Sequence, residues 1–122
     1  AHPLWPEIDA ASERSHEVPF VAGRGTPRGE GVLDVLYRTR RGWCIVDFKV
    51  DAVPADETPA VVVARHREQM MRYHAAVRDL LGVEARWALC LLDFGGSVRV
   101  LDEDGRDAVF APEDATASPP AR

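Results

Sequence analysis

Lysine is almost absent from this sequence. Of its 15 basic residues, 14 are arginine, and Lys49 is the single lysine. In a chain that uses arginine for nearly all of its positive charge, a lysine marks a position where a compact ammonium group on a flexible stem is required, because a broad planar guanidinium does not replace it. The competing interpretation is chance, since one lysine must lie somewhere. Lys49 is therefore a candidate functional residue whose meaning depends on its neighbours.

Cysteine is scarce and long apolar runs are missing. The chain has two cysteines, Cys44 and Cys90, too few for a four-cysteine zinc or iron–sulfur site. No apolar run approaches the roughly 20 residues of a membrane helix, and no basic segment with a small-residue cleavage site opens the sequence. We therefore expect two reduced, buried thiols in a cytoplasmic protein without a membrane partner.

The sequence also lacks a positive balance of charge. Its net charge is −5, whereas a domain that holds nucleic acid by electrostatics alone is basic. A nucleic-acid function would need a metal ion, a local arginine cluster or a larger parent protein. The 122 residues suffice for one compact domain, and 46% hydrophobic and 29% charged residues are typical of a globular one.

The order of predicted elements indicates an α/β domain. We expect a short helix after Pro6, three strands, a long helix, and two strands with a third near Val109. The predicted strands and long helix occupy 15–22, 31–39, 42–50, 60–81, 84–94 and 97–104. The long helix has Thr58 as a possible cap and Gly82 just past its end. We divide the chain into an N-terminal segment (1–14), a domain (15–110) and a disordered tail (111–122) rich in Ala, Pro and acids.

The second and third strands hold the best chemical evidence. Arg40, Arg41 and Gly42 predict a hairpin between them, and an even number of turn residues places Asp34 directly opposite Asp47. Asp47 and Lys49 then share a face, about 6–7 Å apart by strand rise. Two facing carboxylates repel, and Mg²⁺ or Mn²⁺ resolves the repulsion. The alternatives are a salt bridge at a strand end, or a three-residue turn that shifts the register by one.

The long helix adds an amide and a phenol on one face. Gln69 and Tyr73 lie four residues apart; the plainer interpretation is that they border the core. The two histidines of the helix, His66 and His74, are expected to be exposed or partly packed. Glu17 is a further ligand or, in the favoured interpretation, a solvent-facing strand residue. Loop arginines flank the hairpin and either meet a phosphate backbone or are simply solvated: Arg24, Arg28, Arg40 and Arg41.

Together these pieces resemble the RecB-type nucleases of the PD-(D/E)XK superfamily, in particular the nuclease domains at the C-terminal end of UvrD/AddA-like helicases. The matching stretches follow one another in the family's order, from about residue 15 to 95: Glu17-Val-Pro-Phe, Gly31-Val-Leu-Asp-Val-Leu-Tyr, Ile45-Val-Asp-Phe-Lys-Val-Asp and Gln69-Met-Met-Arg-Tyr. The resemblance implies a restriction-endonuclease-like core, a mixed β-sheet flanked by helices, with the N-terminal helix short or missing.

The resemblance also assigns roles. Asp34 and Asp47 are similar to the family's metal-binding acids, the main-chain carbonyl of Phe48 to a further ligand of Mg²⁺ or Mn²⁺, and Lys49 to the catalytic lysine. Gln69 and Tyr73 match the element that handles DNA beside the site. The implied activity is metal-dependent hydrolysis of DNA phosphodiester bonds, with a helicase domain in the same chain or complex as partner.

Three departures accompany the resemblance. The family's histidine or glutamate ligand on an earlier helix has no clear counterpart; nearby candidates are His2, Glu7, Glu13 and Glu17. Val50 replaces the threonine common after the lysine, and the four cysteines of iron–sulfur relatives are missing, so no cluster is expected. A missing third ligand leaves an alternative: a catalytically inactive module of the same fold that binds DNA or another subunit.

Overall fold

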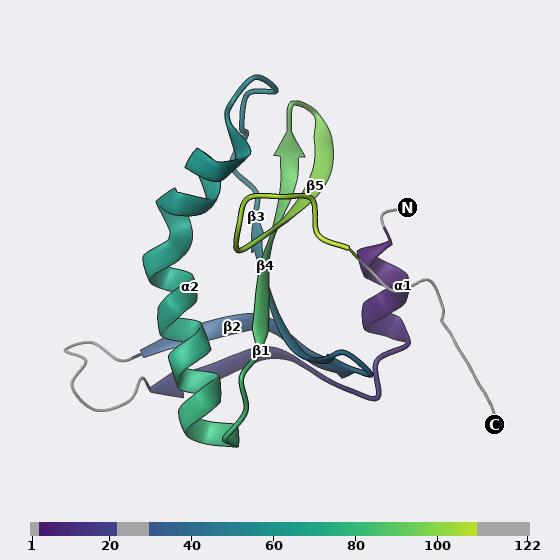
Figure 1. The fold of residues 1–122 in the computed structure, drawn as a ribbon, viewed down its shortest axis with the longest axis vertical. Helices are drawn as coiled ribbons and strands as arrows, with labels where there is room; N and C mark the ends of the chain where they lie inside the picture. The colour runs from purple at the N-terminus through teal and green to yellow at the C-terminus, as the bar shows by residue number, and fades with distance from the viewer. Residues whose placement is uncertain (1–2, 22–29, 110–122) are drawn as a thin grey trace.

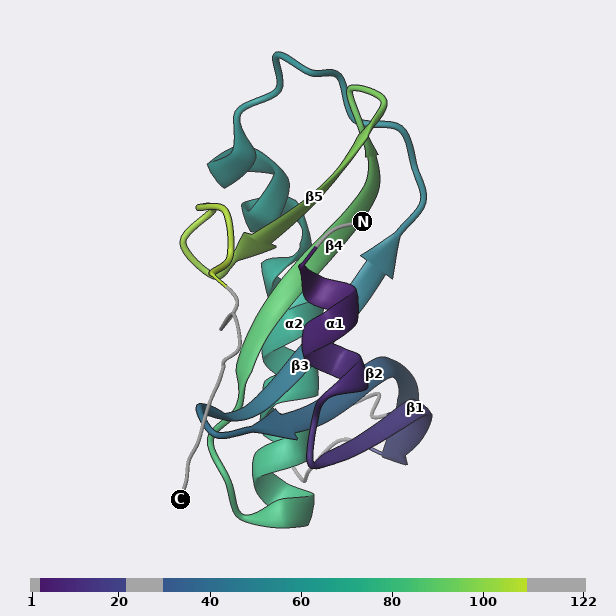
Figure 2. The ribbon, with the colours of Figure 1, turned by 90° about the vertical axis from the view of Figure 1, so that its right-hand side faces the viewer.

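The computed structural model describes residues 3–21 and 30–109, with the backbone alone described for 18–21 and 30–32. Five strands form one sheet in the order β1-β2-β3-β4-β5, with α2 on one face and α1 on the other (Figures 1 and 2). In chain order the elements are α1 (Leu4–Asp9), β1 (Glu13–Val21), β2 (Glu30–Thr39), β3 (Gly42–Lys49), α2 (Pro59–Leu81), β4 (Arg86–Phe94) and β5 (Ser97–Asp102). The mixed α/β architecture predicted from the sequence is confirmed.

The hairpin of β2 and β3 has the expected two-residue turn. Thr39 pairs with Gly42, whose φ of 104° is a conformation that favours glycine. The antiparallel ladder continues to Val35 and Val46, and the next positions on the two strands are Asp34 and Asp47. The even register therefore holds, and the shift expected from a three-residue turn does not occur.

The long helix is the crossover between two parallel strands. α2 connects β3 to β4, which pair in parallel, while the other neighbouring strands of the sheet run antiparallel. Gly82 ends the helix in a left-handed conformation, and its N–H donates to the carbonyl of Arg78 at 2.8 Å. Thr58 is at the N-cap, but its side chain makes no capping hydrogen bond. β1 is an edge strand, as Pro19 indicated.

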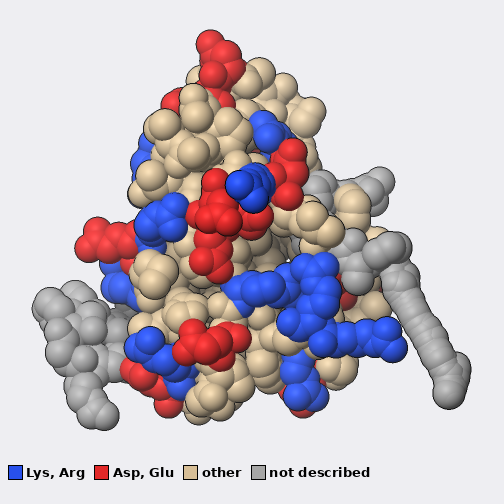
Figure 3. Space-filling view, viewed as in Figure 1, with Lys and Arg blue, Asp and Glu red and all other residues tan. Residues whose placement is uncertain are grey.

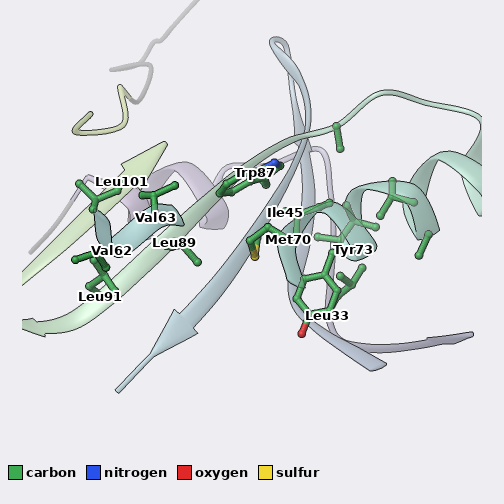
Figure 4. Packing of buried hydrophobic residues seen from close by; sticks show 14 of the residues in the cluster. Leu33, Ile45, Val62, Val63, Met70, Tyr73, Trp87, Leu89, Leu91 and Leu101 are labelled. Atoms are coloured by element: carbon green, nitrogen blue, oxygen red, sulfur yellow. The ribbon is translucent and has the colours of Figure 1, made fainter. Parts of the chain in front are cut away.

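Two apolar cores lie on the two faces of the sheet. Between α2 and the sheet, Met70, Ile45 and Leu89 are fully buried, with Trp87 almost so (Figure 4). On the other face Leu4 and Ile8 of α1 pack against the sheet. Both cysteines are buried and unbridged, as expected.

A buried acid anchors α1 to this second core. Glu7 is 7% exposed, and its Oε2 accepts a 2.6 Å hydrogen bond from the Tyr37 hydroxyl. The hydroxyl supplies a partner that a buried carboxylate needs. This contact fixes the short helix against β2 despite its length of 6 residues.

Several boundaries differ from the sequence expectations. α1 begins at Leu4 rather than after Pro6. Leu80 and Leu81 are apolar but are 63% and 47% exposed, because the last turn of α2 extends past Val77, the last buried residue of the helix. Near Val109 the described chain has one bridge, between Leu101 and Asp107, in place of a strand.

The predicted tail lies outside the described residues. Within the described ranges, none of the helices has the length and apolar character to span a bilayer.

Candidate active site between β2, β3 and α2

Asp34 lies at an irregularity in β2. Leu33 and Leu36 both pack on the α2 side of the sheet, whereas Val35 packs on the α1 side, so the usual alternation breaks at this position. The pairing of β1 with β2 skips Glu17 and Asp34, and Glu17 has a φ of 53°, which is rare for a non-glycine residue. Asp34 Oδ2 accepts a 2.8 Å hydrogen bond from the backbone N–H of Phe48. The carboxylate of β2 is thus fixed to the backbone of β3.

Asp47 and Lys49 form a close ion pair on β3. Lys49 Nζ lies 2.9 Å from Asp47 Oδ2, with side chains 22% and 6% exposed respectively. Asp47 Oδ2 is buried, and among the described residues it has no partner in hydrogen-bonding geometry. We treat the contact as an ion pair, because the separation is short while the angles are poor for a hydrogen bond.

Burial has the largest effect on the pKa of Asp47. Loss of solvent raises the pKa of its carboxyl, and the neighbouring Asp34 raises this pKa further. The Lys49 ammonium opposes both effects through its close contact and its charge. A second cation at this position would relieve the remaining repulsion between the two carboxylates.

Lys49 also contacts α2. Its Nζ donates a 2.7 Å hydrogen bond to Gln69 Oε1, and Gln69 Nε2 donates a 3.0 Å hydrogen bond to the Tyr73 hydroxyl. The spacing of four residues places Gln69 and Tyr73 on the same helix face. One polar chain therefore runs from Asp47 through Lys49 and Gln69 to Tyr73.

Tyr73 lies at the boundary between this polar chain and the core. Its side chain packs in the core cluster under α2, and it is 6% exposed. Burial raises the pKa of its hydroxyl, and the charges of Asp47 and Asp34 raise this pKa further. The phenol therefore stays protonated at neutral pH, and the charges of both carboxylates contribute to its raised pKa. The plainer interpretation, a residue bordering the core, is correct for its ring, while its hydroxyl belongs to the site.

The structure adds His66 to the surroundings of the site. Burial lowers the pKa of its imidazole, and the charge of Lys49 lowers it further. From the sequence, His66 is expected to be exposed or partly packed, on the helix stripe that also carries Gln69 and Tyr73, because positions three or four apart share a helix face.

Other candidate residues lie elsewhere or are not described. His74 Nε2 is 3.0 Å from Glu84 Oε1 and belongs to a separate pair. Glu17 is exposed, in line with the favoured interpretation of a solvent-facing residue. Arg24 and Arg28 lie outside the described residues, as does His2. Within the residues described, no group of three or more His, Cys, Asp or Glu side chains is arranged to hold a metal ion.

The two carboxylates nevertheless suit a hard divalent cation. Mg²⁺ is commonly bound by one or two carboxylates and completes its shell with water and substrate phosphate oxygens. Asp47 Oδ2 is a buried oxygen whose 2.9 Å contact with Lys49 Nζ lacks hydrogen-bond geometry, and Asp34 is held nearby by the Phe48 amide. These two acids are the residues that would hold Mg²⁺ or Mn²⁺.

Comparison with known proteins does not identify a family for this chain. The sequence matches no protein-family model, and no curated protein matches it significantly. The function therefore has to be inferred from the site itself.

Proposed function

We propose that this chain is a metal-dependent deoxyribonuclease domain that hydrolyses phosphodiester bonds. The observation that carries the proposal is the contact chain of the single lysine, whose Nζ lies 2.9 Å from Asp47 Oδ2 and 2.7 Å from Gln69 Oε1. A lysine held between an acid and an amide has a fixed position for its charge. The resemblance of the motifs around Asp34, Asp47 and Lys49 to RecB-type nucleases supports the same function.

The restriction-endonuclease-like core belongs to this proposal. In support, the sheet is mixed, the hairpin carries the two acids and the lysine, and the crossover helix supplies Gln69 and Tyr73. This is the order in which the resembling family uses these elements. A helicase domain in the same chain or complex is the proposed partner.

Each side chain has a defined task in this proposal. Asp34 and Asp47 hold Mg²⁺ or Mn²⁺, with the main-chain carbonyl of Phe48 as the further ligand implied by the resemblance. The ion, when bound, supplies Lewis-acid activation of water and neutralises phosphate charge. Lys49 places a positive charge where negative charge develops on the phosphate oxygens.

Gln69 and Tyr73 complete the arrangement from the helix. Gln69 accepts from Lys49 and donates to Tyr73, so it orients the ammonium with its oxygen and the phenol with its nitrogen. The two residues are proposed to contact DNA beside the site. Because both lie on one rigid helix, their positions relative to Lys49 are set by the fold.

The test is a cleavage assay on labelled DNA with Mg²⁺ or Mn²⁺. We expect the wild type to cleave, and Asp47→Asn and Lys49→Ala to lose cleavage by about 100-fold or more. Asp79→Asn is the matched control, because Asp79 is a 46% exposed helix acid paired with Arg78. A wild type that cleaves no DNA, or variants that retain full activity, would overturn the proposal.

A second candidate function is a module of the same fold that binds DNA or another subunit without cleaving. Its support is the observation that no third acid or histidine of the described residues joins Asp34 and Asp47. DNA binding without cleavage in the same assay, at any concentration of Mn²⁺, would favour this second function.

A further inference from the structure

A dense positive surface lies away from the candidate site. Figure 3 shows a group of basic side chains at the lower right, where Figure 1 places the turn between β2 and β3. Three exposed arginines belong to this end of the hairpin: Arg38, Arg40 and Arg41, here called the hairpin arginines. A local positive surface on a chain of net charge −5 is the arginine cluster that a nucleic-acid function needs.

Little negative charge neutralises the hairpin arginines. Among the described residues, the one acid in ion-pair contact with them is Glu13, with an oxygen 3.7 Å from Arg38 Nε. At this distance, with both side chains about half exposed, the pair contributes little. Arg41 donates to the carbonyl of Val109 at 3.0 Å, a neutral acceptor that leaves its charge uncompensated.

Neighbouring residues hold the surface in place and add charge. The guanidinium of Arg38 lies 5.6 Å from the ring centroid of Trp43, its cross-strand partner, a cation–π distance. Arg86, at the start of β4, has Nε and Nη2 buried without a hydrogen-bond partner among the described residues. Arg86 pairs in register with Cys44, two residues past Gly42, so it lies close to the turn end of β3.

The hairpin arginines lie at the opposite end of β3 from the candidate site. Arg38 stands opposite Trp43 at the start of β3, and Asp47 and Lys49 lie near its end. Seven residue steps separate Gly42 from Lys49, or about 23 Å of strand. With one phosphate per roughly 3.4 Å along a B-form strand, this distance corresponds to about seven nucleotides.

We propose that the turn end of the β2–β3 hairpin is a second nucleic-acid contact, at which the hairpin arginines bind phosphate groups of a DNA strand whose other part occupies the site at Lys49. The inference rests on the proposed function, because it names a surface for the same substrate. Guanidinium groups suit phosphate oxygens, which they bind with two parallel hydrogen bonds. The contact is independent of base sequence and positions the strand.

The test is equilibrium binding of a fluorescent oligothymidylate of roughly 20 nucleotides, long enough to span both sites, measured in EDTA so that no cleavage occurs. For Arg40→Ala/Arg41→Ala we expect the affinity to fall by about tenfold. We also expect the slope of log affinity against log salt to become shallower by about 0.7 for each phosphate that the variant no longer neutralises. A duplex of the same length, run in parallel, shows whether the surface prefers a single strand.

Two further variants make the result specific. Arg78→Ala removes an exposed arginine of α2 that pairs with Asp79, and we expect wild-type affinity and salt slope. Arg40→Lys/Arg41→Lys keeps the charge and is expected to retain most of the slope. The unfolding midpoint of each variant should match that of the wild type, because Arg40 and Arg41 are exposed turn residues.

The outcomes separate this inference from the proposed function. Unchanged affinity and slope in Arg40→Ala/Arg41→Ala would overturn the hairpin contact and leave the nuclease proposal standing. Weaker binding by that variant, in a protein that cleaves no DNA with Mn²⁺, would support the hairpin contact while overturning the nuclease proposal.

Discussion

Lys49 is the residue on which the proposed chemistry depends most. It is the single lysine of the sequence, and its ammonium touches an acid of its own strand and an amide of the opposite helix. A point charge with three donors satisfies two acceptors that lie in different directions, whereas a planar guanidinium presents its donors in one fork. The contacts therefore give a physical reason for lysine at this position.

Lys49→Arg should retain the charge and lose the activity. We expect DNA cleavage to fall by about 100- to 1000-fold, because the longer, planar side chain displaces either Asp47 or Gln69 from its position against the cation. Single-turnover cleavage rates measure this effect, and far-ultraviolet circular dichroism checks the fold. Cleavage within a factor of a few of the wild type would show that any cation serves here.

Asp47→Asn should stabilise the protein at neutral pH while removing its activity. The pKa of Asp47 is raised from 3.8, chiefly by burial, so the folded state binds its proton more tightly than the unfolded state does. The free energy of unfolding of the wild type therefore falls as pH rises from about 4 through the raised pKa. Asparagine does not titrate, so the free energy of unfolding of the variant does not fall with pH in this way.

Urea unfolding at several pH values, without added metal, measures this prediction. Asp79→Asn again serves as the control, because it changes an exposed acid of α2 and leaves the buried pair intact. An Asp47→Asn variant less stable than the wild type at pH 7 would show that the ion pair with Lys49 outweighs the cost of burying the carboxylate.

The two thiols should be unreactive in the folded protein. Burial raises the pKa of Cys90 to about 11 and raises the pKa of Cys44 as well. Because the thiolate is the reactive form, we expect alkylation by iodoacetamide to be slow at pH 8 and fast after addition of denaturant. Rapid labelling of either cysteine without denaturant would contradict the packing of β3 and β4.

At the scale of elements, α2 links the core to the site. The helix buries Val62, Val63 and Met70 against the sheet and places Gln69 beside Lys49. Packing of one face thereby fixes the position of the adjoining polar groups. Loosening this packing should affect both stability and cleavage.

Met70→Ala and Met71→Ala are a matched pair of variants that tests how α2 packs on the sheet. Met70 is fully buried, and its truncation should lower the free energy of unfolding by about 2–5 kcal/mol. Met71 is 47% exposed, and its truncation should cost much less. Thermal or urea unfolding measures both; equal losses of stability would contradict the orientation of α2 on the sheet.

Much of this arrangement could be predicted from the sequence, because local rules govern it. The two-residue turn sets the register that brings Asp34 and Asp47 to neighbouring positions, and the four-residue spacing joins Gln69 to Tyr73. The irregularity at Asp34 was not predictable, since it depends on the pairing of β1 and the unusual backbone of Glu17. Nor was the hydrogen bond from Lys49 to Gln69, because it arises only when α2 packs on the sheet.

At the scale of the whole molecule, one face of the sheet packs against α1 and the other carries the candidate site. On the α1 face, the buried Glu7–Tyr37 hydrogen bond and the apolar residues around it fix the short helix. On the α2 face, the core extends to Asp47, Lys49 and Tyr73. Positive charge gathers at the hairpin turn although the chain as a whole is acidic (Figure 3). In the proposed DNA contact, a negatively charged strand would be attracted by this local charge and not by the net charge.

The central claim is that Asp34 and Asp47 form one metal site. Calorimetric titration with Mn²⁺ tests it most directly, on the wild type, Asp34→Ala and Asp47→Ala, with Asp79→Asn as control. The account predicts binding by the wild type and the control, and no binding by either site variant while circular dichroism shows both folded. Equal binding in all four proteins, or none in any, would contradict the claim that these two acids hold a metal ion.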